Sequence, residues 1–195
     1  MALDRRQITD AALALLDEVG LAELSTRRLA ARLSVSSPTL YWHVKDKAQL
    51  LDLLAEAVCE DAFEIDETQD WRGQLEQGLH QFRAMLLKHR DAATLLRERP
   101  PGPNRLAHIE RTARILLEAG FTPEDTAGIA RLLTAHVLAS VERPGKPDPE
   151  AAKAFRETLK DYPNARTLGF TGLTADDLFA LGTEVILDGL AQRRK

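Results

Sequence analysis

One short stretch constrains the fold of this chain more than any other, and it runs from Ser25 to Lys47. It reads STRRLAARLSVSSPTLYWHVKDK. Apolar residues recur at helical spacing in two short segments, and Val35 lies between them as the apolar residue of a tight turn. Two short helices with hydroxyl, aromatic and basic groups on the second are typical of a helix-turn-helix unit. The second helix of such a unit lies in the major groove of duplex DNA.

Residues that begin helices support this interpretation. Ser25 or Thr26 can cap the first of the two helices, and Ser36 or Ser37 can cap the second. Pro38 then falls in the first turn of the second helix, where its missing N–H costs nothing. The apolar platform that would hold the two helices at a fixed angle comprises Leu24, Leu29, Leu33, Val35, Leu40 and Val44.

Almost every other segment also has the spacing of an amphipathic helix. A first helix is predicted to end at Gly20, and a fourth to begin after Asp46 and run to about Phe63. No strand alternation of usable length occurs, so the predicted fold class is all-α. Later helices are predicted over about 71–99, 105–119 and 123–141, and from Thr174 onward, with a short amphipathic piece at 150–160.

The composition shifts after Ile65, which places a domain boundary within 64–70. We expect residues 1–46 to form a three-helix helix-turn-helix DNA-binding domain, and 47–66 to be a connecting helix. Residues 67–195 would form a helical domain for effector binding and dimerisation.

The charge of the chain is unevenly distributed. The whole sequence carries −4, whereas residues 25–47 carry five cationic side chains against Asp46, a local charge of +4 that leaves −8 elsewhere. A basic face on an acidic body suits phosphate contact through one patch. The alternative is a chance cluster on a solvated surface.

Composition excludes several classes of protein. With 44% hydrophobic and 29% charged residues, the chain has ordinary globular chemistry. A single cysteine rules out an internal disulfide and fits a reducing cytoplasm. The first residues contain acids and no long apolar run, and no segment approaches 18 uninterrupted apolar residues. We therefore expect a cytoplasmic protein with no secretion signal and no membrane span.

Nine side chains of the helix-turn-helix segment are candidates for DNA contact. Arg27 can offer its guanidinium to guanine O6 and N7, the commonest specific contact in a major groove. Pro38 suits a thymine methyl. Tyr41 and Trp42 could instead be partly buried packing residues, and His43 a surface histidine. The full set is Thr26, Arg27, Ser37, Pro38, Thr39, Tyr41, Trp42, His43 and Lys47.

Residues 4–60 resemble the DNA-binding domain of the tetracycline-repressor (TetR) family, above all in the run Pro38-Thr39-Leu40-Tyr41-Trp42-His43-Val44-Lys45. The resemblance implies a homodimer with two N-terminal reading heads on a helical body, and DNA contacts at the nine residues named above. The family's tetracycline-responsive members have a longer amide side chain where this chain has Ser37, so we expect a different base preference there. The resemblance continues more weakly through Trp71, Phe82-Arg83, Arg90-Asp91 and Gly120-Phe121.

A regulator of this type needs an effector site between the helices of its body. A Phe and Met stripe at helical spacing could equally be core, and scattered histidines could be surface residues. The predicted lining residues are Phe82, Met85, Leu86, Leu95, His108, Thr112 and His136.

The resemblance also limits which effector can bind. The positions that hold tetracycline in the family fall near Ala62, Gly78 and Leu95, which cannot supply its polar contacts. We therefore expect a small hydrophobic or polycyclic effector that is not tetracycline with magnesium. No metal-ligand spacing occurs, and no cofactor is expected.

The segments 123–141 and 174–192 are apolar on broad faces. Paired with the same segments of a second subunit they would form a four-helix interface, as the resemblance implies. The alternative is that both pack only within the monomer. Gly182 and Gly189 favour a close helix interface.

Two other functional classes compete with a regulator. A helical enzyme would need a histidine with an orienting carboxylate, but His108 and Glu110 would point apart on a helix. A helical adaptor would have no use for the DNA-contacting set. We therefore predict no catalytic residues and a ligand-responsive transcriptional regulator. It would be a repressor that an effector releases from a palindromic double-stranded DNA operator.

Overall fold

The computed structural model describes residues 3–61, 63–142, 148–168 and 173–194, and within these ranges the chain is helical with no strand. This confirms the predicted all-α class. The helices are α1 (Arg5–Glu23), α2 (Thr26–Arg32), α3 (Ser37–Tyr41), α4 (Lys47–Val58), α5 (Trp71–Leu87), α6 (Ala92–Glu98), α7 (Pro103–Glu118), α8 (Pro123–Ser140), α9 (Pro149–Thr158), α10 (Pro163–Leu168) and α11 (Ala175–Arg193), with a 3-10 turn at Leu159–Asp161.

Capping side chains begin the helices where the sequence predicts them. The Ser25 side chain accepts from the Arg28 N–H, and the Ser36 hydroxyl accepts from the Thr39 N–H. Asp46 caps α4 in the same way. Thr122 and Thr174 cap α8 and α11, so both starts are confirmed. Each such bond satisfies an N–H that the helix itself leaves without a partner.

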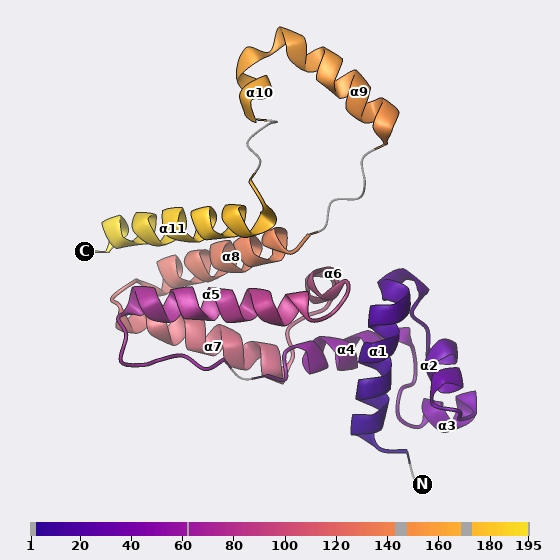
Figure 1. The fold of residues 1–195 in the computed structure, drawn as a ribbon. Helices are drawn as coiled ribbons and strands as arrows, with labels where there is room; N and C mark the ends of the chain where they lie inside the picture. Colours follow the sequence, from indigo (N-terminus) through magenta and orange to yellow (C-terminus); the bar gives the residue numbers. More distant parts are fainter. Residues whose placement is uncertain (1–2, 62, 143–147, 169–172, 195) are drawn as a thin grey trace.

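The helices fall into two groups joined by α4 (Figure 1). Helices α1, α2 and α3 gather at one end, where α1 packs against both α2 and α4. The bundle of α5, α7, α8 and α11, with the short α6 packed against α5, forms the other group, and α4 contacts α6 and α7. Helices α9 and α10 extend beyond α8 and α11, away from the bundle.

The prediction of one continuous helix over 71–99 is wrong, because the structure has two helices here, α5 and α6, with a break between them. Asp91 has a left-handed backbone with φ of 58°. The Leu21 N–H donates to the Asp91 carboxylate over 2.9 Å, and the Arg90 N–H donates to Asp17 over 2.8 Å. These contacts with α1 replace helical bonds. No glycine or proline occurs at the break, so the sequence carried no local signal for it.

The connecting helix is also shorter than predicted, since α4 ends at Val58 and not near 63–66. Side chains of α5 bind the main chain that follows. The Glu64 N–H donates to the Gln81 side chain over 2.7 Å, and the Asp66 N–H donates to Gln77 over 2.9 Å. These distant partners satisfy backbone groups that a longer helix would have paired internally.

Gly182 is required by packing inside one subunit. A Cβ at this position of α11 would lie 2.4 Å from Cε1 of His136 on α8. The His136 ring cannot easily retreat, because Nε2 donates to the Phe179 carbonyl over 3.2 Å and the ring stacks on Phe179. A Cβ at Gly189 would meet nothing within 4 Å in the described subunit.

We predict that Gly182→Ala lowers the free energy of unfolding by about 1–3 kcal/mol through overpacking. Gly189→Ala is the matched control on the same helix. Its Cβ would meet nothing within the described subunit, so Gly189→Ala should not cause the overpacking loss expected for Gly182→Ala. Urea unfolding at one fixed protein concentration measures both. Equal effects of the two substitutions would contradict the packing described for Gly182.

Candidate DNA-binding and effector-binding sites

The turn between α2 and α3 is rigid. Ser34 has a left-handed φ of 55°, and the Val35 N–H donates to the Ala30 carbonyl over 3.0 Å. Leu29 and Leu40 are buried beneath the two helices. The two helices are thus fixed relative to each other, as groove recognition requires.

All nine predicted DNA-contacting side chains except Thr26 are exposed, and Thr26 is half-buried. Trp42 is 87% exposed and Tyr41 is 59% exposed, so packing within the subunit does not explain this aromatic pair. Exposed aromatic side chains beside donors indicate an interaction surface. The structure therefore brings the predicted set together on one end of the molecule.

Ion pairs reduce the positive charge that this surface presents. Arg28 pairs with Glu23 over 2.7 Å and Arg32 pairs with Glu18 over 2.6 Å, both acids of α1. Among the residues that the structure describes, Arg27, Lys45 and Lys47 make no ion pair. These three cations are available for phosphates or bases. Counting charges along the sequence could not show which cations are paired with acids of α1 and which are available.

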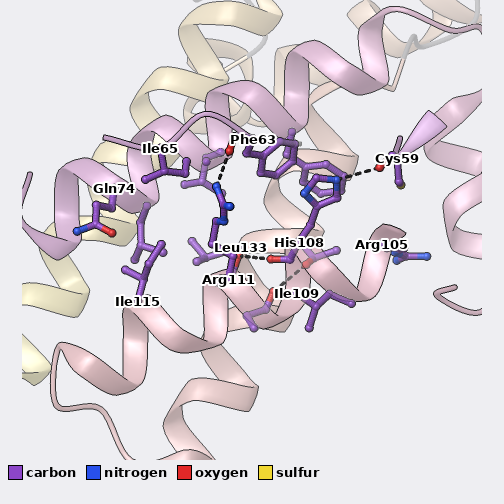
Figure 2. A pocket seen from close by; sticks show the side chains of 17 residues that line it. Cys59, Phe63, Ile65, Gln74, Arg105, His108, Ile109, Arg111, Ile115 and Leu133 are labelled. Carbon is purple, nitrogen blue, oxygen red and sulfur yellow. Dashed lines mark hydrogen bonds between the residues drawn. The ribbon is translucent and has the colours of Figure 1, made fainter. Parts of the chain in front are cut away.

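A second site is a cavity of about 80 Å³ between α5, α7, α8 and the segment after α4 (Figure 2). Three predicted effector contacts, Phe82, His108 and Thr112, line it. Its other lining residues are Cys59, Phe63, Ile65, Gln74, Leu75, Gly78, Leu79, Arg105, Ile109, Arg111, Ile115, Ala130, Leu133 and Thr134. Arg105, Arg111 and Ile115 lie on α7 three, three and seven residues from His108. This helical spacing could have predicted them from the sequence once His108 was a candidate.

The other four predicted effector contacts do not line this cavity. Met85 and Leu86 continue the α5 stripe of Phe82 by one turn, but they are buried in the core beyond the cavity. Leu95 is fully buried on α6 because the break after α5 redirects the chain. His136 faces α11, where Nε2 also lies 3.1 Å from the Thr183 hydroxyl.

The polar groups of the cavity are largely committed to main-chain carbonyls. His108 Nε2 donates to the Cys59 carbonyl over 3.1 Å, and the Thr134 hydroxyl donates to Ala130 over 2.8 Å. Arg111 donates to the Phe63 carbonyl. Burial raises the pKa of the Cys59 thiol to about 11, so this sulfur is neutral and unreactive. The cavity is therefore lined mainly by apolar side chains, with hydroxyl acceptors, the Gln74 amide and the remaining donors of the Arg105 and Arg111 guanidinium groups.

Burial also lowers the pKa of His108, with the Arg111 charge as a smaller cause. The unfolded chain then takes up the proton more readily, so the fold loses stability as pH falls from about 6.5 through the lower folded value. We predict that His108→Gln flattens part of this loss between neutral and mildly acidic pH. Urea unfolding at several pH values checks it, and an unchanged slope would contradict it.

Three further observations bear on ligands and partners. Within ranges 3–61, 63–142, 148–168 and 173–194, no group of three His, Cys, Asp or Glu side chains could hold a metal ion. Three positions were expected to lie where the family holds tetracycline. Of these, Gly78 lines the cavity, Leu95 is buried elsewhere, and Ala62 lies outside the described residues. None of the described helices is long and apolar enough to cross a membrane.

A rigid, exposed helix-turn-helix on a helical body with an internal cavity defines the class of one-component DNA-binding regulators. The model of the bacterial regulatory proteins of the tetR family matches residues 8–54, and that of the tetracyclin repressor-like C-terminal domain matches 65–194. The chain belongs to the TetR family. As a member it is a ligand-responsive, DNA-binding transcriptional repressor, and it works on operator DNA as a dimer.

Several relatives share most of the chain. It is 34% identical to the tetracycline repressor protein class A from transposon 1721 of Escherichia coli, covering 98% of this chain and 92% of that protein. ActR of Streptomyces coelicolor in complex with actinorhodin has a TM-score of 0.83 at 32% identity, covering 100% of this chain and 99% of that one. TetR class A with 5a,6-anhydrotetracycline and magnesium has a TM-score of 0.72 at 31% identity, covering 99% and 100%. These relatives are regulators and not enzymes.

Proposed function

We propose that this chain represses transcription by occupying a palindromic operator through α3 and that a small molecule bound in the α5–α7–α8 cavity releases it. Residues 1–46 would be the reading head, 47–66 the connecting segment and 67–195 the effector-binding and dimerisation unit. The observation that carries the DNA half is the exposed Tyr41–Trp42 pair on a rigidly capped α3.

The nine predicted DNA-contacting side chains fall into three groups according to what they would contact. Arg27 and the tip of α3, Ser37 and Pro38, would read bases. Short hydroxyls and a lysine suit phosphate oxygens, namely Thr26, Thr39, Tyr41 and Lys47. Trp42 and His43 would add base or backbone contacts. Serine at position 37 is short, so its base preference should differ from that of the tetracycline-responsive relatives.

Dimerisation is proposed through α8 and α11. Leu132 on α8 is 51% exposed, and Leu181 and Val185 on α11 are 50% and 61% exposed. Apolar side chains so exposed on two packed helices fit the four-helix interface expected for two subunits. Gly189 has open space at its Cα and suits the same interface.

The effector is proposed to be a small hydrophobic or polycyclic molecule. Apolar walls with few polar groups are typical of such sites. Relatives include a protein bound to actinorhodin and one bound to 5a,6-anhydrotetracycline with magnesium. Gly78 lines the cavity where a polar partner of tetracycline is expected, which favours a different polycycle and no metal. We further propose that the chain has no enzymatic activity or cofactor and that it works in the cytoplasm, where operator DNA lies.

Footprinting on the DNA upstream of the chain's own gene tests this function. The expected result is protection of a palindrome whose half-sites lie roughly 34–36 Å apart, or one helical turn. Protection should fade when a compound that raises the protein's melting temperature is added. Protection without any palindromic element, or none at all, would reject the proposal.

A further inference from the structure

Two arginines of α7, Arg105 and Arg111, line the cavity, and no acidic side chain of the described residues lines it. Within those same residues neither arginine makes an ion pair. Main-chain carbonyls hold the two guanidinium groups instead. Arg105 donates to the carbonyls of Leu96 and Arg99, over 2.5 and 3.2 Å. Arg111 donates to the Phe63 carbonyl. Because a carbonyl carries no net charge, both positive charges stay without a counter-charge.

The acids around the cavity are committed elsewhere. The next arginine along α7, Arg114, lies outside the cavity and pairs with Glu67 over 2.9 Å. The charge of Glu56 acts on the Cys59 thiol, but the Glu56 carboxylate accepts from the Asn104 N–H over 2.9 Å and does not line the cavity. An arginine cannot lose its charge by deprotonation in a protein. The two cavity arginines can therefore be neutralised only by an anion that enters from outside the chain.

Aromatic walls surround these charges. The His108 and Phe63 rings stack with centroids 3.9 Å apart, and the Phe63 and Phe82 ring centroids lie 6.3 Å apart. Figure 2 shows Arg111 beside Phe63 and Arg105 at one end of the group of lining residues. Ring faces of this kind favour a flat aromatic ligand. A guanidinium beside them favours a ligand that also carries a negative charge.

We infer that the cavity selects an aromatic carboxylate, whose anionic group pairs with Arg111 while Arg105 adds positive potential. The inference rests on the proposed function, since this ligand would be the effector. The planar guanidinium fork matches a carboxylate in two parallel bonds, and most of the Arg111 donors stay available for them. Such a pair is stronger in a partly buried site than in water. A neutral ligand of the same shape would leave both arginine charges unpaired.

Naphthalene-2-carboxylate and naphthalene-2-carboxamide test the inference, because the two probes share a shape and differ in charge at neutral pH. Isothermal titration calorimetry on the full chain without DNA should show that the carboxylate binds about tenfold or more tighter than the amide. Arg111→Gln keeps a polar donor but removes the charge. It should weaken carboxylate binding about tenfold or more and amide binding by less than about twofold. Arg105→Gln should weaken carboxylate binding about threefold.

Two controls place the effect in the cavity. Arg114→Gln removes an arginine of the same helix that pairs with Glu67, and it should change the affinity for neither probe. Gly78→Leu fills the cavity and should abolish carboxylate binding.

The comparison of the two probes on the wild-type protein needs no variant to fold. Equal affinity for both probes, no binding of the carboxylate, or carboxylate binding that survives in Gly78→Leu would overturn the inference. So would equal losses of both probes in Arg111→Gln. If aromatic carboxylates bind as expected but none weakens operator binding, the proposed release by an effector fails, while the anion preference of the cavity stands.

Discussion

Arg27→Ala is expected to reduce operator affinity by about 1–3 kcal/mol for each half-site, because a bidentate arginine–guanine contact contributes about this much discrimination. Arg27 is exposed at the start of α2 and, within the described parts of the chain, is free of ion pairs. Two copies act in a dimer, so the measured loss should be about 2–6 kcal/mol, which is a fall in affinity of about thirtyfold or more. Fluorescence anisotropy on labelled operator measures it.

Arg28→Ala is the matched control for Arg27→Ala. The two arginines are adjacent, but Arg28 is paired with Glu23 on α1 over 2.7 Å. Its removal should cost operator affinity less than tenfold. Size-exclusion chromatography should show that both variants keep the oligomeric state of the wild type. Equal losses in the two variants would mean that Arg27 contributes charge alone and does not read a base.

Gly78→Leu is expected to abolish effector binding while leaving operator binding intact. A Cβ at Gly78 meets only Ile65 Cδ1, at 3.7 Å, so the position tolerates a side chain, and the leucine would occupy the cavity. A ligand at a hundred times its Kd stabilises the wild type by about 2.7 kcal/mol, which raises Tm by roughly 5–10 °C. This shift should disappear in the variant.

A thermal-shift screen of hydrophobic and polycyclic natural products supplies the ligands for that comparison. Glu76→Leu is the control, because it places a leucine on the exposed side of the same helix. It should keep the full shift. Compounds that stabilise Gly78→Leu as strongly as the wild type would show that the effector binds somewhere other than this cavity. Tetracycline with magnesium should give no shift in any of the three proteins.

Local chemistry made the helix starts predictable. Ser25, Asp46, Thr122 and Thr174 each carry a side chain that accepts the orphan N–H of the helix that follows, so sequence and structure agree there. The start of α3 was predictable in the same way, because Ser36 caps it. Each of these capping bonds joins residues three apart in the chain, so the local sequence alone encodes it.

The errors arise where distant residues decide the backbone. The break before α6 depends on Asp17 and Leu21 of α1, and the early end of α4 on Gln77 and Gln81 of α5. Helical periodicity cannot show such partners. The residues that line the cavity were mispredicted for the same reason. Phe82 and Met85 lie on one stripe of α5, but only Phe82 lines the cavity, because core packing fills the next turn.

Fluorescence anisotropy of the wild-type protein over a series of salt concentrations tests whether the α2–α3 head binds an operator sequence-specifically. We expect nanomolar-class binding to DNA from the gene's own upstream region, about a thousandfold or more tighter than binding to scrambled DNA. Binding to both DNAs should weaken steeply as salt rises. Equal affinity for the two DNAs at every salt concentration would show that the head does not recognise a sequence.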